Sequence, residues 1–408
     1  MDLELIPRRL SGAVTPPPSK SRAHRLLLCA ALAEGTSSLH NIYLSDDVRA
    51  TLACAEALGA RWEERDGVLR MTGRGGSARR EEPPRFDCGE SGSTLRFLLP
   101  VALAVCGGGV FTGRGRLMRR PQGPYRELFE MKGIDWRQEG DTLTVSGALP
   151  AGEYSLPGDV SSQFFSGLLL ALPLADGVST VRASTPPESA DYIAMTLDAL
   201  ALAGVRIEET DGGFRVTPQK YRPFEAAVEA DWSQAAFWIA ARTLGNDVSV
   251  RGLDPASRQG DKRIAACAER LAAPGDVEID VRQCPDLVPP LAVMAALREG
   301  SCRIGGAARL RHKESDRLTS VTAALRALGA EIREEPEALV LRGVPALQGG
   351  AVDCCGDHRI AMMAAVAAAR CRGPVRLHGA DCVKKSYPDF WDVYQSLGGE
   401  CHVLQPRR

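Results

Sequence analysis

The 408-residue chain has no long apolar run and no excess of charge of either sign. Its most apolar stretches, near residues 164–175 and 360–369, fall far short of the roughly 20 residues that cross a bilayer. The chain has 50 Lys and Arg residues and 51 Asp and Glu residues, and this balance excludes a general nucleic-acid or membrane-surface binder. Aromatic residues make up only 5% of the chain, so no aromatic and basic face for single-stranded nucleic acid is indicated either.

Several motifs are also missing. Twelve cysteines occur without one C-x-x-C pair, which indicates neither a zinc site nor a disulfide framework and fits a reducing cytoplasm. The N-terminus lacks the apolar core of a signal peptide. No Walker A pattern occurs, and in Gly89–Ser93 the second glycine comes one residue too early for a nucleophile elbow. We therefore expect a cytoplasmic protein without a metal site.

What the sequence does contain is an internal repeat. A helical apolar pattern that ends in Gly and precedes a short alternating segment occurs six times. These glycines are 74, 71, 71, 54 and 69 residues apart: Gly59, Gly133, Gly204, Gly275, Gly329 and Gly398. The starts of apolar helices are 70, 69, 71, 54 and 72 residues apart, near Arg22, Gly92, Ser161, Trp232, Asp286 and His358. Because both series share the shorter interval, they argue against a chance origin.

Each repeat is about 70 residues long, and its sequence pattern predicts a strand, a helix, a strand, a helix and a β-hairpin. Asp66-Gly67, Glu139-Gly140-Asp141 and Asp211-Gly212-Gly213 lie between alternating segments, as hairpin turns do. Three repeats can close around one core, so we predict two similar α/β domains. No Gly/Ser-rich or charged linker is found, which places a short junction near residues 16–18 or 227–230.

Small, hydroxyl and charged residues open the predicted helices. The first turn of a helix offers unpaired N–H groups and a positive dipole end, which favour phosphate or carboxylate. Such starts are Ser19–Arg22, Gly89–Thr94, Ser161–Gln163 and Gly356–Arg359. Each one alone also reads as an ordinary N-cap.

Cations beside these starts favour the binding of anions. The set is Lys20, Arg25, Arg96, Arg119, Arg120, Lys313, Arg317, Arg359, Lys384 and Lys385. A charge-assisted hydrogen bond contributes about 1.5–3 kcal/mol, so several cations can hold two multiply charged small anions without a metal ion.

Through these residues the chain resembles the EPSP synthase (3-phosphoshikimate 1-carboxyvinyltransferase) family, from Lys20 to Lys385, in motifs that follow the family's order. The resemblance implies a two-domain inverse (inside-out) α/β barrel, each domain built of three β-α-β-α-β-β repeats. It implies one domain at residues 19–229, which binds mainly shikimate 3-phosphate. The second, at 1–18 and 230–408, would complete the phosphoenolpyruvate site, with the active site in the interdomain cleft.

The resemblance also implies the binding residues. Those for shikimate 3-phosphate are Lys20, Ser21, Arg25, Ser161, Ser162, Gln163, Ser189, Tyr192, Asp286 and Lys313. Those for phosphoenolpyruvate are Lys20, Gly92, Arg96, Arg120, Gln163, Arg317, Arg359 and Lys385. No cofactor is implied.

The implied reaction is addition followed by elimination. The 5-hydroxyl of shikimate 3-phosphate attacks C2 of phosphoenolpyruvate while C3 is protonated, and the tetrahedral intermediate loses phosphate. The implied catalytic residues are Asp286, Glu314 and Lys20. Asp286 would orient and deprotonate the hydroxyl and Glu314 would handle the C3 proton, while Lys20 is equally a candidate acid or a stabiliser of the departing phosphate. The sequence leaves that assignment open.

Three positions depart from the common family pattern. Glu90 stands where Asn is common, and a carboxylate about 4 Å from a substrate anion would cost about 1–4 kcal/mol. We therefore expect Glu90 to point at a cation such as Arg120. Phe97 replaces a common Pro, which leaves the response to glyphosate open, and Arg309 adds a cation near the shikimate phosphate.

Two other functions are compatible with the fold. UDP-N-acetylglucosamine enolpyruvyl transferases typically carry Lys-Asn in the first motif and a reactive Cys before Arg-Pro. Here the first motif is Lys20-Ser21, and Gly113–Arg120 holds no cysteine. A non-catalytic phosphometabolite-binding protein would lack Asp286, Glu314 or Lys20, and all three are present. We expect a monomer that binds neither nucleic acid nor membrane.

Overall fold

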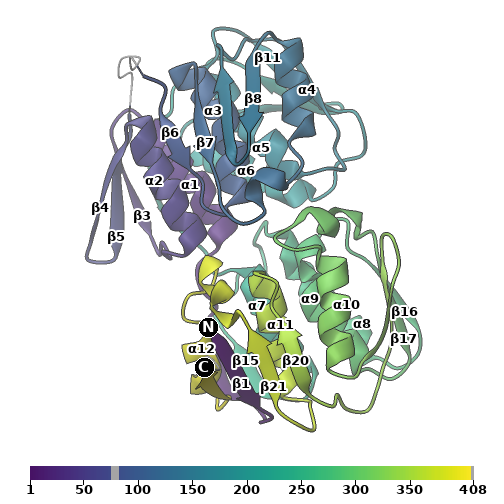
Figure 1. Cartoon of the computed structure of the whole chain (residues 1–408). Coiled ribbons are helices and arrows are strands. Elements are labelled where there is room, and N and C mark those ends of the chain that lie inside the picture. The colour runs from purple at the N-terminus through teal and green to yellow at the C-terminus, as the bar shows by residue number, and fades with distance from the viewer. Residues whose placement is uncertain (75–81, 406–408) are drawn as a thin grey trace. The chain divides into compact units, whose positions relative to one another are not determined.

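The computed structural model describes residues 1–74 and 82–405 (Figure 1). The chain divides into two compact units. The inserted unit runs from Pro18 to Glu229, and the terminal unit joins Met1–Pro17 to Ala230–Arg408. Both units mix α-helices with β-sheets, so the predicted α/β class is confirmed. Among the described residues, no helix combines the length and the apolar character that a membrane span requires.

The inserted unit alternates strands and helices. Its α-helices are α1 (Lys20–Leu32), α2 (Asp46–Leu58), α3 (Gly92–Cys106), α4 (Gly123–Met131), α5 (Ser162–Ala171) and α6 (Ala190–Leu202). Its strands are β3 (Thr36–His40), β4 (Arg61–Arg65), β5 (Val68–Thr72), β6 (Arg85–Asp87), β7 (Gly108–Thr112), β8 (Asp135–Glu139), β9 (Thr142–Ser146), β10 (Glu153–Leu156), β11 (Ser179–Ala183), β12 (Glu208–Thr210), β13 (Gly213–Val216) and β14 (Glu225–Ala227). Short 3-10 helices are η1 (Leu117–Arg119) and η2 (Leu172–Leu174).

Its sheets share one topology. Their strand orders are β14-β3-β5-β4, β6-β7-β9-β8 and β10-β11-β13-β12. In each, the first pair is parallel and the last two strands form an antiparallel hairpin, such as β8 with β9. The predicted hairpin turns lie between β4 and β5, β8 and β9, and β12 and β13. The repeat pattern is therefore confirmed in this unit.

The terminal unit has α7 (Trp232–Thr243), α8 (Ile264–Ala272), α9 (Val288–Ala296), α10 (Arg317–Ala327), α11 (His358–Ala368) and α12 (Phe390–Ser396). Its strands are β1 (Asp2–Ile6), β2 (Ser11–Val14), β15 (Asp247–Val250), β16 (Val277–Asp280), β17 (Ser301–Gly305), β18 (Glu331–Glu334), β19 (Leu339–Arg342), β20 (Gly350–Asp353), β21 (Val375–His378) and β22 (Glu400–Leu404). Short 3-10 helices are η3 (Gly260–Arg263), η4 (Pro285–Leu287), η5 (Ala308–His312) and η6 (Ala380–Lys385).

Two repeats of the terminal unit depart from the predicted hairpin. After Gly275 the chain enters β16, which pairs in parallel with β17 and begins the next sheet, β16-β17-β19-β18. The missing hairpin explains the 54-residue interval, and the fourth repeat keeps only the parallel pair β15-β2. In the last sheet, β20-β21-β1-β22, the N-terminal strand β1 takes the hairpin position and pairs antiparallel with both β21 and β22.

The six repeat glycines all have positive φ, from 72° at Gly133 to 112° at Gly59. Five of them lie at or directly after the C-cap of a helix, where the left-handed conformation lets the chain leave the last turn, and glycine adopts it without a Cβ penalty. The prediction that these glycines end helices is confirmed for those five. It is wrong for Gly275, because α8 already ends at the extended residue Ala273.

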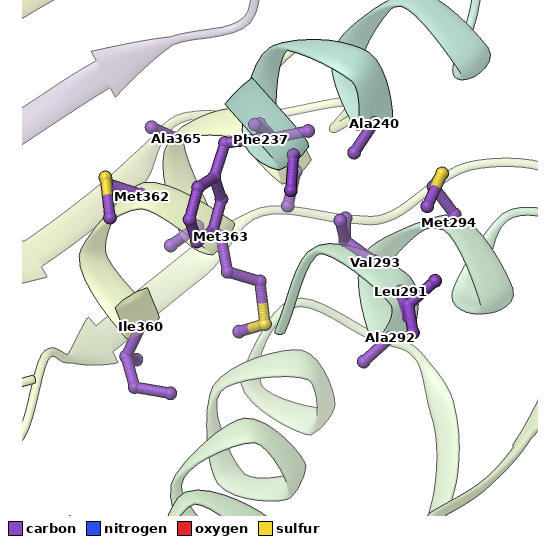
Figure 2. Packing of buried hydrophobic residues seen from close by; sticks show 14 of the residues in the cluster. Phe237, Ala240, Leu291, Ala292, Val293, Met294, Ile360, Met362, Met363 and Ala365 are labelled. Atoms are coloured by element: carbon purple, nitrogen blue, oxygen red, sulfur yellow. The ribbon is translucent and has the colours of Figure 1, made fainter. Parts of the chain in front are cut away.

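Apolar helices form the core of each unit. Every residue of α9 and of α11 is buried, which is the pattern of a helix enclosed on all sides. Figure 2 shows side chains of this core in the terminal unit, with Phe237, Leu291 and Met363 from three different helices. The strands alternate buried and exposed residues, so each sheet turns one face toward the helices.

The helices α3 and α5 approach closely at Gly167. A Cβ at this position would overlap the carbonyl oxygen of Arg96 and the hydroxyl of Tyr125, so only glycine fits. The contact fixes the first turns of α3 and α5 side by side.

Candidate active site

Serine residues cap the buried helices of the inserted unit. The Ser91 hydroxyl accepts a hydrogen bond from the Thr94 amide at 3.2 Å, and the Ser161 hydroxyl accepts one from the Gln163 amide at 3.3 Å. Ser19 caps α1 in the same way. A hydroxyl cap adds no charge, so the positive end of each helix stays available to an anion.

The starts of α3 and α5 form one cluster of donors, named here the Arg96 cluster: Gly92, Arg96, Arg120 and Gln163. Arg96 Nη1 donates to Gln163 Oε1 at 2.8 Å, and Gln163 Nε2 donates to Ser93 Oγ at 2.9 Å. A Cβ at Gly92 would lie 3.0 Å from Arg120 Nη1 and 3.7 Å from Gln163 Oε1. Glycine therefore keeps the backbone of the α3 start open beside these polar groups.

Lys20 begins α1, and its ammonium group contacts the buried Asp47 carboxylate of α2 at 2.7 Å. Helix α1 is tied to α3 through Thr51 of α2: His24 Nδ1 lies 2.7 Å from Thr51 Oγ1, which lies 2.6 Å from Thr94 Oγ1, and the Thr94 hydroxyl donates to Ser91 Oγ at 2.7 Å. This chain of hydrogen bonds holds the first turns of two motif helices in register.

Arg25 is enclosed between aromatic rings. Its guanidinium carbon lies 5.0 Å from the Phe97 ring centroid and 5.9 Å from that of Tyr192. Nε donates to Thr196 Oγ1 at 2.7 Å, and Nη1 donates to the Ser21 carbonyl at 2.7 Å. Burial lowers the pKa of Arg25 to about 10, so the group stays charged at neutral pH.

The remaining predicted residues of the inserted unit lie at the starts of α5 and α6. Ser162 is the buried first residue of α5. Ser189 precedes α6 with a left-handed φ of 56°, and it is buried as well. Tyr192 lies in the first turn of α6, where its carbonyl accepts a hydrogen bond from Arg25 Nη2 at 2.9 Å.

In the terminal unit, buried Arg317 binds three carboxylates, and we name this group the Arg317 cluster. Nε donates to Asp357 Oδ2 at 2.8 Å, Nη1 to Asp286 Oδ1 at 2.6 Å and Nη2 to Glu314 Oε2 at 2.6 Å. Burial alone would lower the pKa of Arg317, but the carboxylates of Asp357, Glu314 and Asp286 outweigh it and raise that pKa. The guanidinium is therefore permanently charged.

Asp286 contacts three cations. Its carboxylate lies 2.6 Å from Arg317, 3.2 Å from Lys313 and 3.6 Å from Arg359. Burial would raise the pKa of Asp286, but the charges of Lys313, Arg359 and Arg317 lower it well below its ordinary value. Burial in turn lowers the pKa of Lys313. Asp286 is thus an ionised hydrogen-bond acceptor at neutral pH.

Arg359 and Lys385 lie beside the Arg317 cluster. Arg359 Nη2 donates to Ser233 Oγ at 2.6 Å, and Nη1 donates to the Asp286 carbonyl at 3.1 Å. Within residues 1–74 and 82–405, its buried Nε has no hydrogen-bond partner. Lys385 Nζ lies 3.9 Å from Glu314 Oε1 and is buried, whereas Lys384 is exposed.

The acids Asp286 and Glu314 both lie outside regular α-helices. Asp286 lies inside η4 and its side chain caps no helix, because α9 begins at Val288 with Leu287 at the cap position. Glu314 pairs with Arg317, yet it precedes the N-cap Asp316, so the pair is not a contact along one helix face. Both carboxylates serve the cations of the Arg317 cluster.

Sequence reasoning missed the partners of the predicted cations. Asp47 forms an ion pair with Lys20, and Asp357 forms one with Arg317. The Ser233 hydroxyl accepts a hydrogen bond from Arg359. Asp357 was visible as the cap within the quoted motif Gly356–Arg359, whereas Asp47 and Ser233 carry no motif signal. The carboxylate of Glu90 lies against Gly115. Its expected contact with Arg120 stays a prediction, as does the phosphate contact of Arg309.

The Arg317 cluster predicts a specific stability loss. Arg317→Met leaves three carboxylates close together without their shared counterion, so we expect unfolding in urea to cost about 3–5 kcal/mol less than in the unmodified protein. The exposed pair of Arg333 with Glu335 is the matched control, and Arg333→Met should cost about 1 kcal/mol at most. Equal losses in the two variants would contradict the buried-ion account.

Known proteins resemble this chain over nearly its whole length. The model of the EPSP synthase (3-phosphoshikimate 1-carboxyvinyltransferase) family matches residues 5–394. The 3-phosphoshikimate 1-carboxyvinyltransferase of Clostridium kluyveri is 40% identical over 97% of this chain and 96% of its own. That of Clostridium perfringens strain 13 is 41% identical over 97% of this chain and 98% of its own.

Solved structures share the fold. EPSP synthase from Acinetobacter baumannii gives a TM-score of 0.81 at 24% identity, covering 99% of this chain and all of its own. The enolpyruvyl transferase NikO from Streptomyces tendae gives a TM-score of 0.78 at 18% identity, covering 98% of each chain. These similarities establish the two-domain α/β fold. With a family match over nearly the whole chain and relatives at about 40% identity, the chain belongs to the EPSP synthase family.

Proposed function

We propose that the two clusters of side chains carry out one reaction, the transfer of the enolpyruvyl group of phosphoenolpyruvate to the 5-hydroxyl of shikimate 3-phosphate. The products are 5-enolpyruvylshikimate 3-phosphate and phosphate, formed in aromatic amino acid biosynthesis. Family membership gives the reaction. The observation that supports the roles below is Asp286, a single ionised carboxylate in contact with three cations.

Shikimate 3-phosphate is bound mainly by the inserted unit. Ser161, Ser162 and Ser189 lie at the starts of α5 and α6, where hydroxyl and amide donors suit a phosphate. Arg25 offers the substrate little more than one Nη1 hydrogen, because its other donors are engaged by protein oxygens. Arg25 therefore contributes one hydrogen bond of fixed direction and a positive charge of fixed position. The other binding residues are Lys20, Ser21, Gln163, Tyr192, Asp286 and Lys313.

Phosphoenolpyruvate is bound by cations from both units. Gly92 lets the anion approach the backbone of the α3 start, beside Arg120 and Arg96. The terminal unit supplies charged donors on side chains, and among the described residues the buried Nε of Arg359 has no hydrogen-bond partner. The full set is Lys20, Gly92, Arg96, Arg120, Gln163, Arg317, Arg359 and Lys385. Fixed positive charge of this kind stabilises the charge that develops on the tetrahedral intermediate.

The three catalytic residues have different tasks, and two of them, Asp286 and Glu314, transfer protons. Asp286 is ionised in the structure, so it accepts the hydrogen bond of the 5-hydroxyl, orients it and takes its proton as the carbon–oxygen bond forms. Glu314, held between Arg317 and Lys385, acts in its protonated form: it delivers that proton to C3 in the addition and, as a carboxylate, recovers it in the elimination. Lys20 stabilises the departing phosphate.

We propose further that the protein works as a monomer in the cytoplasm. The free cysteines of the described residues fit a reducing compartment. Sedimentation at the mass of a dimer would contradict the monomer.

A phosphate-release assay tests the function. With phosphoenolpyruvate as donor, we expect phosphate to be released with shikimate 3-phosphate and not with UDP-N-acetylglucosamine, because the loop Gly113–Arg120 has no cysteine and the first motif is Lys20-Ser21. Release with the sugar nucleotide alone would favour the sister family. No release with either acceptor would favour a non-catalytic binding protein.

Glu314→Gln tests the proposed acid. The amide keeps the shape of the side chain but carries no transferable proton, so we expect kcat to fall by about 10²–10⁴ with the KM values little changed. Glu331→Gln, at an exposed position of β18 in the same unit, serves as the control and should leave kcat unaltered. A kcat for Glu314→Gln equal to that of the control would remove Glu314 from the mechanism.

A further inference from the structure

The guanidinium of Arg359 is held by only a few groups. Nη1 donates to the Asp286 carbonyl, and Nη2 lies 2.6 Å from Ser233 Oγ and 3.6 Å from Asp286 Oδ2. Arg359 is buried, with only 5% of its surface exposed. Even so, its Nε has no hydrogen-bond partner in the part of the chain that the structure describes. The orientation of this group therefore depends strongly on the Ser233 hydroxyl.

Ser233 links Arg359 to a residue outside the site described so far. Its hydroxyl lies in the first turn of α7 and hydrogen-bonds the Asp261 side chain of η3. Arg359 can only donate hydrogen bonds, so the single proton of the Ser233 hydroxyl must point at Asp261. The hydrogen bonds thus run in one direction, from Arg359 through Ser233 to the carboxylate of Asp261.

Asp261 is 1% exposed, so it is too deeply buried to touch a substrate. The groups that face it are the carboxylates of Asp231 and Asp286, the cation of Arg359 and the thiol of Cys284. Burial first, and then the negative charge of Asp286, raise the pKa of Asp261 to about 6. The carboxyl is therefore charged above pH 6 and neutral below it.

We propose that Asp261 is a positioning residue, which orients the Arg359 guanidinium toward phosphoenolpyruvate through the Ser233 hydroxyl. A charged acceptor fixes the direction of the Ser233 proton and strengthens the bond from Arg359, whereas a neutral acceptor holds both more weakly. The role rests on the proposed function, because Arg359 is assigned there to phosphoenolpyruvate. Asp261 thus affects the binding of phosphoenolpyruvate without contacting this substrate.

Asp261→Asn tests the role, since it keeps the shape and an acceptor oxygen but removes the charge. At pH 7.5 we expect the KM for phosphoenolpyruvate to rise about five-fold, the difference between a charged and a neutral hydrogen-bond acceptor, with kcat and the KM for shikimate 3-phosphate unchanged. At pH 5 the unmodified enzyme carries a protonated Asp261, so the ratio of the two KM values should approach one.

Two further variants make the test specific. Ser233→Ala removes the bridge, so adding Asp261→Asn to it should raise the KM for phosphoenolpyruvate no further. Asp254→Asn changes an exposed carboxylate of the same unit, whose Oδ1 accepts from the Ala256 amide, and should behave as the unmodified enzyme.

Three results would overturn the proposal. They are a KM ratio that does not vary with pH, equal rises in both KM values, and additive effects of Ser233→Ala and Asp261→Asn. Each would make Asp261 a residue of general structural importance. Failure of the unmodified enzyme to release phosphate with shikimate 3-phosphate would instead refute the proposed function, so the two failures can be told apart.

Discussion

A group of cations that receives an anion must also remain together before the anion arrives. This electrostatic constraint governs the structure around Arg317. Two like charges about 4 Å apart repel by roughly 1–4 kcal/mol at the dielectric of water or of a protein surface, so a bare group of arginines and lysines would spread apart. Asp286, Glu314 and Asp357 supply the countercharge, each within 2.8 Å of the guanidinium. Their number leaves the cluster with charge to offer a ligand, because Lys313, Arg359 and Lys385 join the same group.

The two units meet this constraint in different ways. In the inserted unit the caps of α1, α3 and α5 are serines, and Arg96 and Arg25 are held by neutral oxygens and aromatic rings. Their helix ends keep a positive dipole. In the terminal unit the caps of α7 and α11 are Asp231 and Asp357, which neutralise the helix ends and leave recognition to side chains. Asp357 does both tasks, because one oxygen caps α11 and the other binds Arg317.

The sequence predicted the parts of the fold that local chemistry determines. The starts of α3, α7 and α11 fall at the predicted Gly92, Trp232 and His358, because small or capping residues precede apolar runs there. The hairpin positions in the terminal unit could not be predicted the same way, since β1 and β22 are separated by almost the whole chain. Some of the predicted cations lie together, Arg96 with Arg120 and Arg317 with Lys313, Arg359 and Lys385, but the partners Asp47 and Ser233 were missed. Nothing in a single sequence marks an acid or a hydroxyl as the neighbour of a distant lysine or arginine.

The position of β1 has a consequence for synthesis on the ribosome. β1 is made before the inserted unit, yet its neighbours β21 and β22 are made after it, so this sheet closes only when the final repeat has emerged. The inserted unit, in contrast, is complete in sequence once Glu229 has been added. Domains fold as units while the chain grows. The inserted unit can therefore fold on the ribosome while β1 still lacks its partner strands. The pairing of β1 with β21 and β22 thus joins the segments on either side of the inserted unit only after that unit has been made.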